Sequence, residues 1–276
     1  MTALIVAGWA AMGLCALLIV IVLVVRARIA AGDRRARGRR TEVSAILRTL
    51  LVAGEGAPAP RSTVTLHAIA SVASRVRGED REAIQCWLRD NGAPLVARRG
   101  MRSRRPIERA RAVRLYVRST VEPSMSVLIR MLDDADLRVR STTALEWGST
   151  GRDEAIEPVM AAACREERRL PPLVASIAIM RCRLLDAESL HAAWSTRDPD
   201  GLRVALSTGS AAGIAAVQPY ALQSLDHDDV LVRIAAVDAL RRIGTRRAVE
   251  PLQRRAAIEG NAIVRHHVAE ALAVLS

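Results

Sequence analysis

An internal repeat constrains the fold of this chain more than any other feature of its sequence. Seven positions carry matching residue types after an offset of 93 residues, which equals three units of 31. The first copy is Asp136, Val139, Arg140, Ala144, Gly151, Glu157 and Pro158, and the second is Asp229, Val232, Arg233, Val237, Gly244, Glu250 and Pro251. A partial third copy begins at Asn261, 32 residues after the second. Self-similarity at such a period predicts a stack of equivalent supersecondary units.

The spacing within each copy predicts a helix, a short turn and a second helix. Asp229 precedes an apolar-periodic stretch, where a carboxylate can accept hydrogen bonds from the free amides of a helix start. Apolar residues then recur at intervals of three and four, at Val232, Ala236, Val237, Leu240 and Ile243. Gly244 suits the end of this helix, and Pro251 suits the first turn of the next. One helix pair cannot bury both its faces, so neighbouring pairs must stack.

This pattern resembles the HEAT repeat, and it is nearest to the short form that includes the phycobilisome-lyase-like repeats. The clearest copy begins at Asp229 and ends at Leu252. The resemblance is specific over residues 132–160 and 225–276, loose over 105–131 and 171–222, and absent before about residue 100. It implies an all-α fold, an α-solenoid of the armadillo type. It also implies that the aspartates and arginines of the motif stabilise contacts between successive units, at Asp136, Arg140, Asp229 and Arg233.

We expect the solenoid to span residues 41–276, with divergent helices over 41–105 and clearer repeats over 106–276. About six or seven helix pairs would account for this length. Pro171 and Pro172 replace the expected start of one unit, which predicts an irregular pair there.

The N-terminus predicts a membrane anchor. Ala3 to Val25 is a run of 23 residues without a charge or a proline. As a helix it would be about 34 Å long, enough to cross a hydrocarbon core of about 30 Å. A cleaved signal peptide is the alternative, but its apolar region is typically shorter and is followed by a small-residue cleavage site. Residues 1–25 are therefore predicted to be a single transmembrane helix.

A basic linker over residues 26–40 sets the expected orientation. It holds seven Arg and one Asp, and no basic side chain precedes the apolar run. The positive-inside rule then places the N-terminus outside the cell membrane and the following domain in the cytoplasm. At the membrane interface, anionic headgroups would attract the arginines of this linker, among them Arg26, Arg28, Arg34 and Arg35.

The remaining charge gathers in a second basic stretch. The chain has no Lys and a formal net charge of +12. Residues 98–118 hold nine Arg and one Glu, so the chain outside the two basic stretches is close to neutral. The candidate partner- or anion-binding residues of this stretch are Arg98, Arg102, Arg105, Arg111, Arg114 and Arg118. On the helix that follows Pro106, Arg111, Arg114 and Arg118 are expected on one face, opposite an apolar face that includes Ile107.

No residue pattern points to an enzyme, a cofactor or a small-molecule substrate. The four cysteines are far apart and form no CxxC pair, which predicts reduced, buried thiols. The chain has no glycine-rich phosphate loop, nucleophile elbow or metalloprotease helix. One HEAT-like family, deoxyhypusine hydroxylase, holds iron through His-Glu dipeptides, and this chain has none. An approach of His227 to His266 or His267 across adjacent units is the one alternative that would give a metal site.

The sequence thus favours a bacterial membrane-anchored scaffold that binds a cytoplasmic or membrane protein through the concave face of its solenoid. An envelope-synthesis enzyme is one partner that it leaves open. The last residues, Ala271 to Ser276, lack a polar cap, so an apolar strip for a partner or a second copy is expected there. The alternative is an anionic-lipid or nucleic-acid binder acting through residues 98–118. The membrane tether and the scarcity of aromatics in that stretch argue against nucleic acid.

Overall fold

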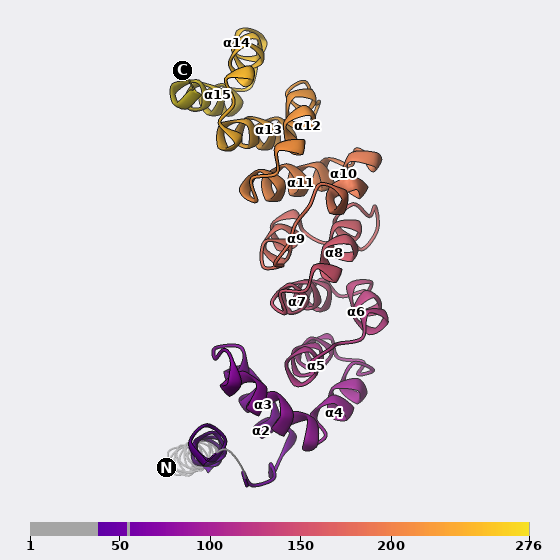
Figure 1. Cartoon of the computed structure of the whole chain (residues 1–276). Coiled ribbons are helices and arrows are strands. Elements are labelled where there is room, and N and C mark those ends of the chain that lie inside the picture. Colours follow the sequence, from indigo (N-terminus) through magenta and orange to yellow (C-terminus); the bar gives the residue numbers. More distant parts are fainter. Residues whose placement is uncertain (1–37, 54–55, 276) are drawn as a thin grey trace, which may run out of the picture. The chain divides into compact units, whose positions relative to one another are not determined.

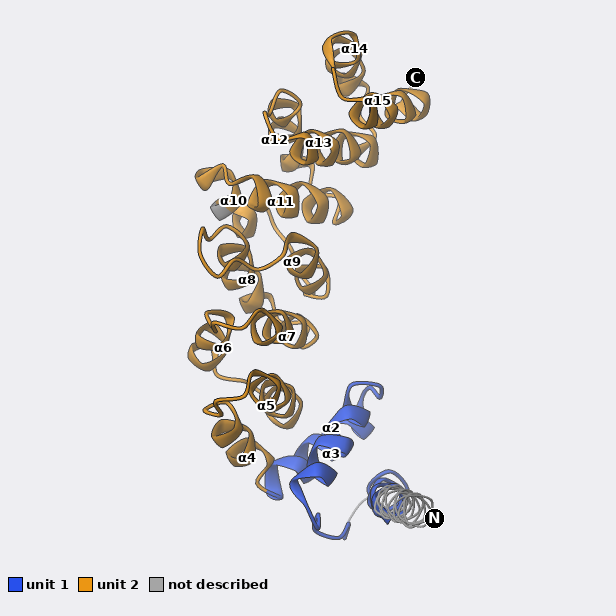
Figure 2. Ribbon diagram, turned by 180° about the vertical axis from the view of Figure 1, so that it is seen from behind, with its two compact units in different colours: residues 1–91 blue, residues 92–276 orange. Residues whose placement is uncertain are grey.

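The computed structural model describes residues 38–53 and 56–275, and the chain divides after Asn91 into two compact units (Figure 2). The predicted transmembrane helix and the membrane-interface arginines lie outside the described residues. Within those described ranges, no helix is both long and apolar enough to cross a membrane.

The first unit is helical. Residues 38–48 form a helix that continues into the π-helical turn η1 (Thr49–Ala53). After it come α2 (Thr63–Ala73) and α3 (Glu79–Asp90), which pack against each other. The Ser62 side chain accepts a hydrogen bond from the Thr65 amide and so caps α2. Ile46, Leu66, Ile69, Ile84 and Leu88 are fully or nearly fully buried and form the core.

The second unit is a stack of helix pairs, and this confirms the prediction that consecutive helices pack in pairs. The predicted pairing is shifted by one helix, because the helix that follows Asp229 packs on the helix before it rather than on the helix that contains Pro251. Within residues 92–275 the pairs are α4 (Ala93–Gly100) with α5 (Pro106–Ser119), α6 (Met125–Leu132) with α7 (Leu137–Gly148), α8 (Ile156–Ala163) with α9 (Pro172–Ile179), α10 (His191–Thr196) with α11 (Pro199–Ala211), α12 (Gln218–Ser224) with α13 (Val230–Ile243), and α14 (Val249–Ile258) with α15 (Ala262–Leu275). Short 3-10 turns, η2 (Asp153–Ala155), η3 (Glu188–Leu190), η4 (Ala215–Val217) and η5 (Arg246–Ala248), precede α8, α10, α12 and α14.

The pairs are arranged in two layers (Figure 1). The odd-helix layer comprises α5, α7, α9, α11, α13 and α15, and each of these helices contacts the next one in the series. The even-helix layer comprises α4, α6, α8, α10, α12 and α14. Small aliphatic side chains fill the space between the layers, and Val232, Ala236, Val237 and Leu240 of α13 are completely buried. The predicted apolar face of this helix is therefore confirmed for these four residues.

Small residues allow the odd helices to approach one another closely. Gly148 ends α7 beside α9, where a Cβ atom would collide with the carbonyl oxygen of Ala178. α9 is short, begins at Pro172 and has no side-chain cap, since Pro171 occupies its N-cap position. The pair α8/α9 is therefore the irregular one expected from the two prolines. Its neighbours α7 and α11 still pack directly on α9.

Candidate interaction surfaces

Four arginines hold the turns of the stack together through hydrogen bonds to main-chain carbonyls. Arg109, Arg140, Arg233 and Arg265 are each the fourth residue of an odd helix. In each case Nη1 donates to the main-chain carbonyls six and five residues earlier. The two carbonyl oxygens lie 3.0 and 3.3 Å from Nη1 of Arg109, and 2.8 and 3.0 Å from Nη1 of Arg140. They lie 2.8 and 2.9 Å from Nη1 of Arg233, and both lie 2.9 Å from Nη1 of Arg265. This arginine clamp closes the turn between the two helices of a pair.

An acidic side chain from the next pair completes the clamp in two of these cases. Asp134 accepts from Nε and Nη2 of Arg109, both at 2.7 Å. Glu259 accepts from Nε and Nη2 of Arg233 at 2.9 and 3.0 Å. Burial raises the pKa of Asp134, but hydrogen bonds from Arg109 and the Asp136 amide outweigh burial and bring that pKa below its usual value. Both carboxylates are therefore charged partners that join one helix pair to the next.

Arg140 has no such acid. Its Nη2 donates to the carbonyl of Arg169 at 3.2 Å, and its buried Nε has no hydrogen-bond partner among the described residues. The aspartates of the motif cap their helices: Asp136 accepts from the Arg138 amide, and Asp229 accepts from the amides of Leu231 and Val232. Asp136, Arg140, Asp229 and Arg233 thus make contacts within the fold.

The odd-helix layer carries a groove that the sequence did not reveal. The odd-helix groove crosses α9, α11 and α13 and has a volume of about 290 Å³. Its apolar lining comes from Leu173 at one side and from Leu231, Ile234 and Ala235 at the other. Leu173 is 71% exposed and Leu231 is 48% exposed. Arg203, Asp238 and Arg242 add charges of both signs.

Exposed aliphatic side chains continue this pattern along the layer. Besides Leu173 and Leu231, they occupy the first or second helical position of α5, α7 and α15, at Ile107, Leu137 and Ile263. α11 carries Asp200 at its second position, and this carboxylate is paired with Arg169 at 2.8 Å. Ile107, which the sequence placed on the apolar face of α5, is 48% exposed, so this face is not buried in the first turn of the helix. A search of the sequence for apolar residues at the first or second position after each helix cap would have found these exposed side chains.

The second basic stretch is divided by its contacts. Arg111 pairs with Glu108 at 3.2 Å, and both Arg114 and Arg118 approach Glu146, at 3.7 and 2.7 Å. Glu146 lies on the neighbouring helix α7. These ion pairs offset part of the positive charge that the sequence predicted for a continuous basic patch. Arg114 and Arg118 share Glu146 as a partner, whereas Arg111 is paired within its own helix.

Arg98 lies in the last turn of α4, and Arg102 and Arg105 lie between α4 and α5. Arg98 places its guanidinium carbon 5.9 Å from the ring centroid of the buried Tyr116. The side chains of Arg102 and Arg105 are exposed and form no hydrogen bond or ion pair within the described ranges. The residues available to an anion are therefore concentrated in residues 98–105.

The histidines do not gather. His267 lies 3.1 Å from Asp238 and His266 lies 3.2 Å from Glu270, whereas His227 Nδ1 accepts from the Asp229 amide at 3.0 Å. Over residues 38–53 and 56–275, no three His, Cys, Asp or Glu side chains form a group that could hold a metal ion. The alternative of a site shared by His227 with His266 or His267 thus receives no support.

Among the described residues, one cysteine is not buried as predicted. Cys164 and Cys182 are half-buried, and burial raises the pKa of Cys182 to about 11. Cys86 is exposed on α3, so the prediction of burial is wrong for this residue. The reason is the helix rotation, which turns Ile84, Trp87 and Leu88 toward the core.

Comparison with known proteins places part of this stack in a family. Residues 188–273, which include the helices from α10 to α14 and most of α15, match the family model of HEAT repeats. None of the curated proteins matches the chain. Among solved structures, the chain is similar to the crystal structure of an engineered protein, with 16% sequence identity over 84% of this chain and 96% of that chain and a TM-score of 0.36. The chain therefore carries a HEAT-repeat domain.

Proposed function

We propose that this protein is a membrane-anchored scaffold that binds a partner protein through the odd-helix groove. HEAT repeats in general serve protein–protein interaction, and stacked repeats present extended surfaces for it. The groove is the observation that carries the proposal for this chain. It exposes two large aliphatic side chains, Leu173 and Leu231, to water, and this exposure does not stabilise an isolated monomer.

The groove suits an apolar segment with a polar edge. Leu173 and Leu231 come from helices on either side of α11, and the α11 residues between them are Arg203 and Ser207. Arg203 is held by Asp200 at 2.9 Å, and Arg242 donates to the Ser207 carbonyl at 3.4 Å. A partner helix with one apolar face could cover the aliphatic side chains and leave these charged groups at the rim.

The membrane part of the proposal rests on the sequence. The uncharged run from Ala3 to Val25 would span the bilayer, and residues 26–40 would keep the following domain in the cytoplasm. The partner is then a cytoplasmic protein or the cytoplasmic part of a membrane protein. An envelope-synthesis enzyme would fit this location.

Affinity capture with matched variants tests the groove. Full-length protein, Leu173→Asp and Ile258→Asp are each captured from detergent-solubilised native membranes, and retained proteins are quantified. Leu173 and Ile258 are equally exposed at 71%, but Ile258 lies on α14, outside the groove. We expect a discrete protein to be retained by the full-length protein and by Ile258→Asp and to be lost with Leu173→Asp. Equal retention by both variants would contradict the proposal.

The exposed thiol of Cys86 tests the orientation. A membrane-impermeant maleimide should leave Cys86 unlabelled in intact cells and should label it after lysis. Cys86→Ser identifies the labelled position. Labelling of Cys86 in intact cells would place the domain outside and contradict the proposed topology.

A second candidate function is anion binding by residues 98–105. The exposed, unpaired side chains of Arg102 and Arg105 favour it, because nothing in the described chain neutralises them. Capture at low and high salt, with and without nuclease, separates the two functions, since phosphate contacts weaken steeply with salt. A captured component that requires Arg102 and Arg105 for its retention and is lost at high salt would indicate that the protein binds an anionic membrane or nucleic acid.

A further inference from the structure

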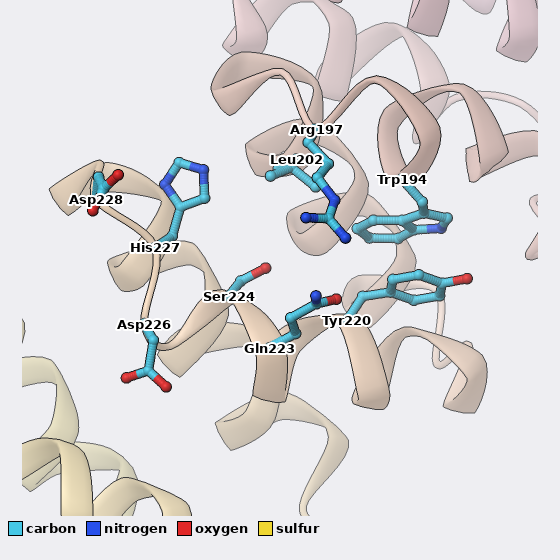
Figure 3. Close-up of a pocket in the computed structure, with 9 residues that line it drawn as sticks. All are labelled: Trp194, Arg197, Leu202, Tyr220, Gln223, Ser224, Asp226, His227 and Asp228. Atoms are coloured by element: carbon cyan, nitrogen blue, oxygen red, sulfur yellow. The ribbon is translucent and has the colours of Figure 1, made fainter.

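A pocket between two successive helix pairs stands apart from the odd-helix groove. It lies where α10 and the start of α11 meet α12 and the turn before α13, and its volume is about 390 Å³ (Figure 3). We call it the aromatic pocket. Its lining is Trp194, Arg197, Leu202, Tyr220, Gln223, Ser224, Asp226, His227 and Asp228. A volume in this range is typical of ligand sites.

One wall of the pocket is formed by two stacked aromatic rings and a leucine. The indole of Trp194 stacks on the ring of Tyr220 with centroids 4.3 Å apart and an interplanar angle of 6° (Figure 3). The stack joins α10 to α12, and Leu202 of α11 extends the apolar surface. Tyr220 remains 38% exposed although the chain has only four Trp, two Tyr and no Phe. This wall can cover an apolar side chain without first reorganising.

Arg197 faces this wall from an unusual backbone conformation. It ends α10 with φ of 51°, in the left-handed region that side chains other than glycine seldom adopt. Arg168 has a similar φ of 50°, but its Nη1 donates to both the carbonyl and the carboxylate of Asp133. The side chain of Arg197 forms no hydrogen bond or ion pair within the described part of the chain. The side chain of Arg168 is thus paired inside the fold, and that of Arg197 is not.

Further hydrogen-bond donors line the same pocket. Ser224 is only 6% exposed, and its hydroxyl has no hydrogen-bond partner among the described residues. Because His227 Nδ1 accepts from the Asp229 amide, the neutral ring carries its proton on Nε2, which is then a donor. Asp226 is paired with Arg255 at 3.2 Å, and Figure 3 shows its carboxylate directed away from Arg197. Asp228 also lines the pocket, but in Figure 3 it lies on the far side of His227 from Arg197. The part of the pocket beside Arg197 therefore offers donors that suit an anionic acceptor.

We propose that the aromatic pocket binds a peptide segment of a partner protein in which an acidic side chain adjoins an apolar one. The carboxylate pairs with the Arg197 guanidinium, a geometry in which Arg donates two parallel hydrogen bonds. The adjoining apolar side chain lies on Leu202 and the Trp194–Tyr220 stack. A lone carboxylate would leave most of the volume and the apolar wall unused, which favours a peptide over a free anion.

This inference rests on the proposed function in one respect, since both assume a protein partner. The aromatic pocket and the odd-helix groove share no lining residue. Failure of the Leu173→Asp experiment and failure of a peptide to enter the aromatic pocket are therefore distinguishable outcomes.

The test measures fluorescence anisotropy of a labelled nonapeptide with one Glu between two Leu in a Gly–Ser background. Full-length protein is used in non-ionic detergent. We expect a dissociation constant below about 1 mM, and binding at least about tenfold weaker when Gln replaces the peptide Glu. Arg197→Gly should weaken binding at least about tenfold without lowering the melting temperature, because glycine adopts this φ readily.

Arg168→Gly is the matched control. It removes the same charge from the same backbone conformation, but Arg168 lies outside the aromatic pocket, so peptide binding should be unchanged. Equal affinity for the Glu and Gln peptides, no effect of Arg197→Gly, or no binding below about 1 mM would each overturn the proposal. Complete competition by acetate or inorganic phosphate at the peptide's own affinity would also overturn it, in favour of a site for small anions.

Discussion

Arg233 and Glu259 form a buried, two-bonded ion pair that joins α13 to the turn before α15. Arg233 Nε lies 2.9 Å from Glu259 Oε2, and Nη2 lies 3.0 Å from Oε1. The side chain of Glu259 is only 1% exposed, and Arg255 adds a second pairing at 2.7 Å. The same carboxylate accepts from the Asn261 amide at 2.8 Å. One acidic side chain thereby holds three segments of the last two helix pairs.

Replacing Glu259 by Gln should loosen the C-terminal part of the stack. The amide keeps the shape but leaves Arg233 without a charged partner in a buried place and leaves Arg255 with Asp226 alone, which costs about 3–5 kcal/mol. Hydrogen exchange should show weaker protection of the α13 and α15 amides, with α5 and α7 unaffected, because repeats couple to their neighbours. Glu250→Gln, at an exposed position of α14, is the control. Unchanged protection in Glu259→Gln would contradict this role.

Acid should weaken the same region. Burial raises the pKa of Glu259, but hydrogen bonds from Arg233, the Asn261 amide and Arg255 outweigh burial and lower that pKa to about 2, from 4.5. Because the folded pKa is depressed, the stabilisation is complete above about pH 4.5 and is lost as the pH falls toward 2. The shift corresponds to a stabilisation on the order of 3 kcal/mol. Unfolding followed by circular dichroism across this range should show a shallower pH dependence in Glu259→Gln.

The helices could be predicted from the sequence because their limits are local. α13 runs from Val230 to Ile243, between the residues predicted to cap it and to end it, Asp229 and Gly244. Gly244 adopts the left-handed conformation, with φ of 74°. Cap, apolar period and terminal glycine all lie within one repeat, so no tertiary information is needed.

The surfaces could not be predicted in the same way, because they depend on neighbours distant in sequence. Arg118 forms an ion pair with Glu146, which lies 28 residues later in the sequence on another helix. This pair removes part of the expected basic patch. Leu231 and Val232 are adjacent and equally apolar, yet Leu231 is 48% exposed and Val232 is buried. The rotation of α13 against α11 and α15 decides which of the two faces the groove. Periodicity alone leaves that rotation uncertain by about one residue.

Arg140 and Arg233 occupy equivalent positions, but their replacement by Met should have unequal effects. Both lose the two carbonyl contacts of the turn, and Arg140→Met also loses the contact with the Arg169 carbonyl. Only Arg233→Met deprives a buried carboxylate of a partner. We expect a loss of about 1–2 kcal/mol in unfolding free energy for Arg140→Met and about 3 kcal/mol for Arg233→Met. Urea unfolding monitored by hydrogen exchange in the respective helices measures each. Equal losses would show that Glu259 contributes nothing net to the clamp.

The contact of α7 with α9 should not tolerate a methyl group at Gly148. A Cβ atom there would overlap the carbonyl oxygen and Cα of Ala178, and main-chain atoms cannot move aside as a flexible side chain can. Gly148→Ala should therefore cost about 1–3 kcal/mol despite the better helix propensity of alanine, because α9 must shift as a unit. Gly260→Ala is the control, since no atom lies within 4 Å of its added Cβ. Thermal unfolding of both variants gives the comparison. A melting temperature of Gly148→Ala at or above that of Gly260→Ala would mean that α9 is free to move, and the pair α8/α9 would then be a hinge in the stack.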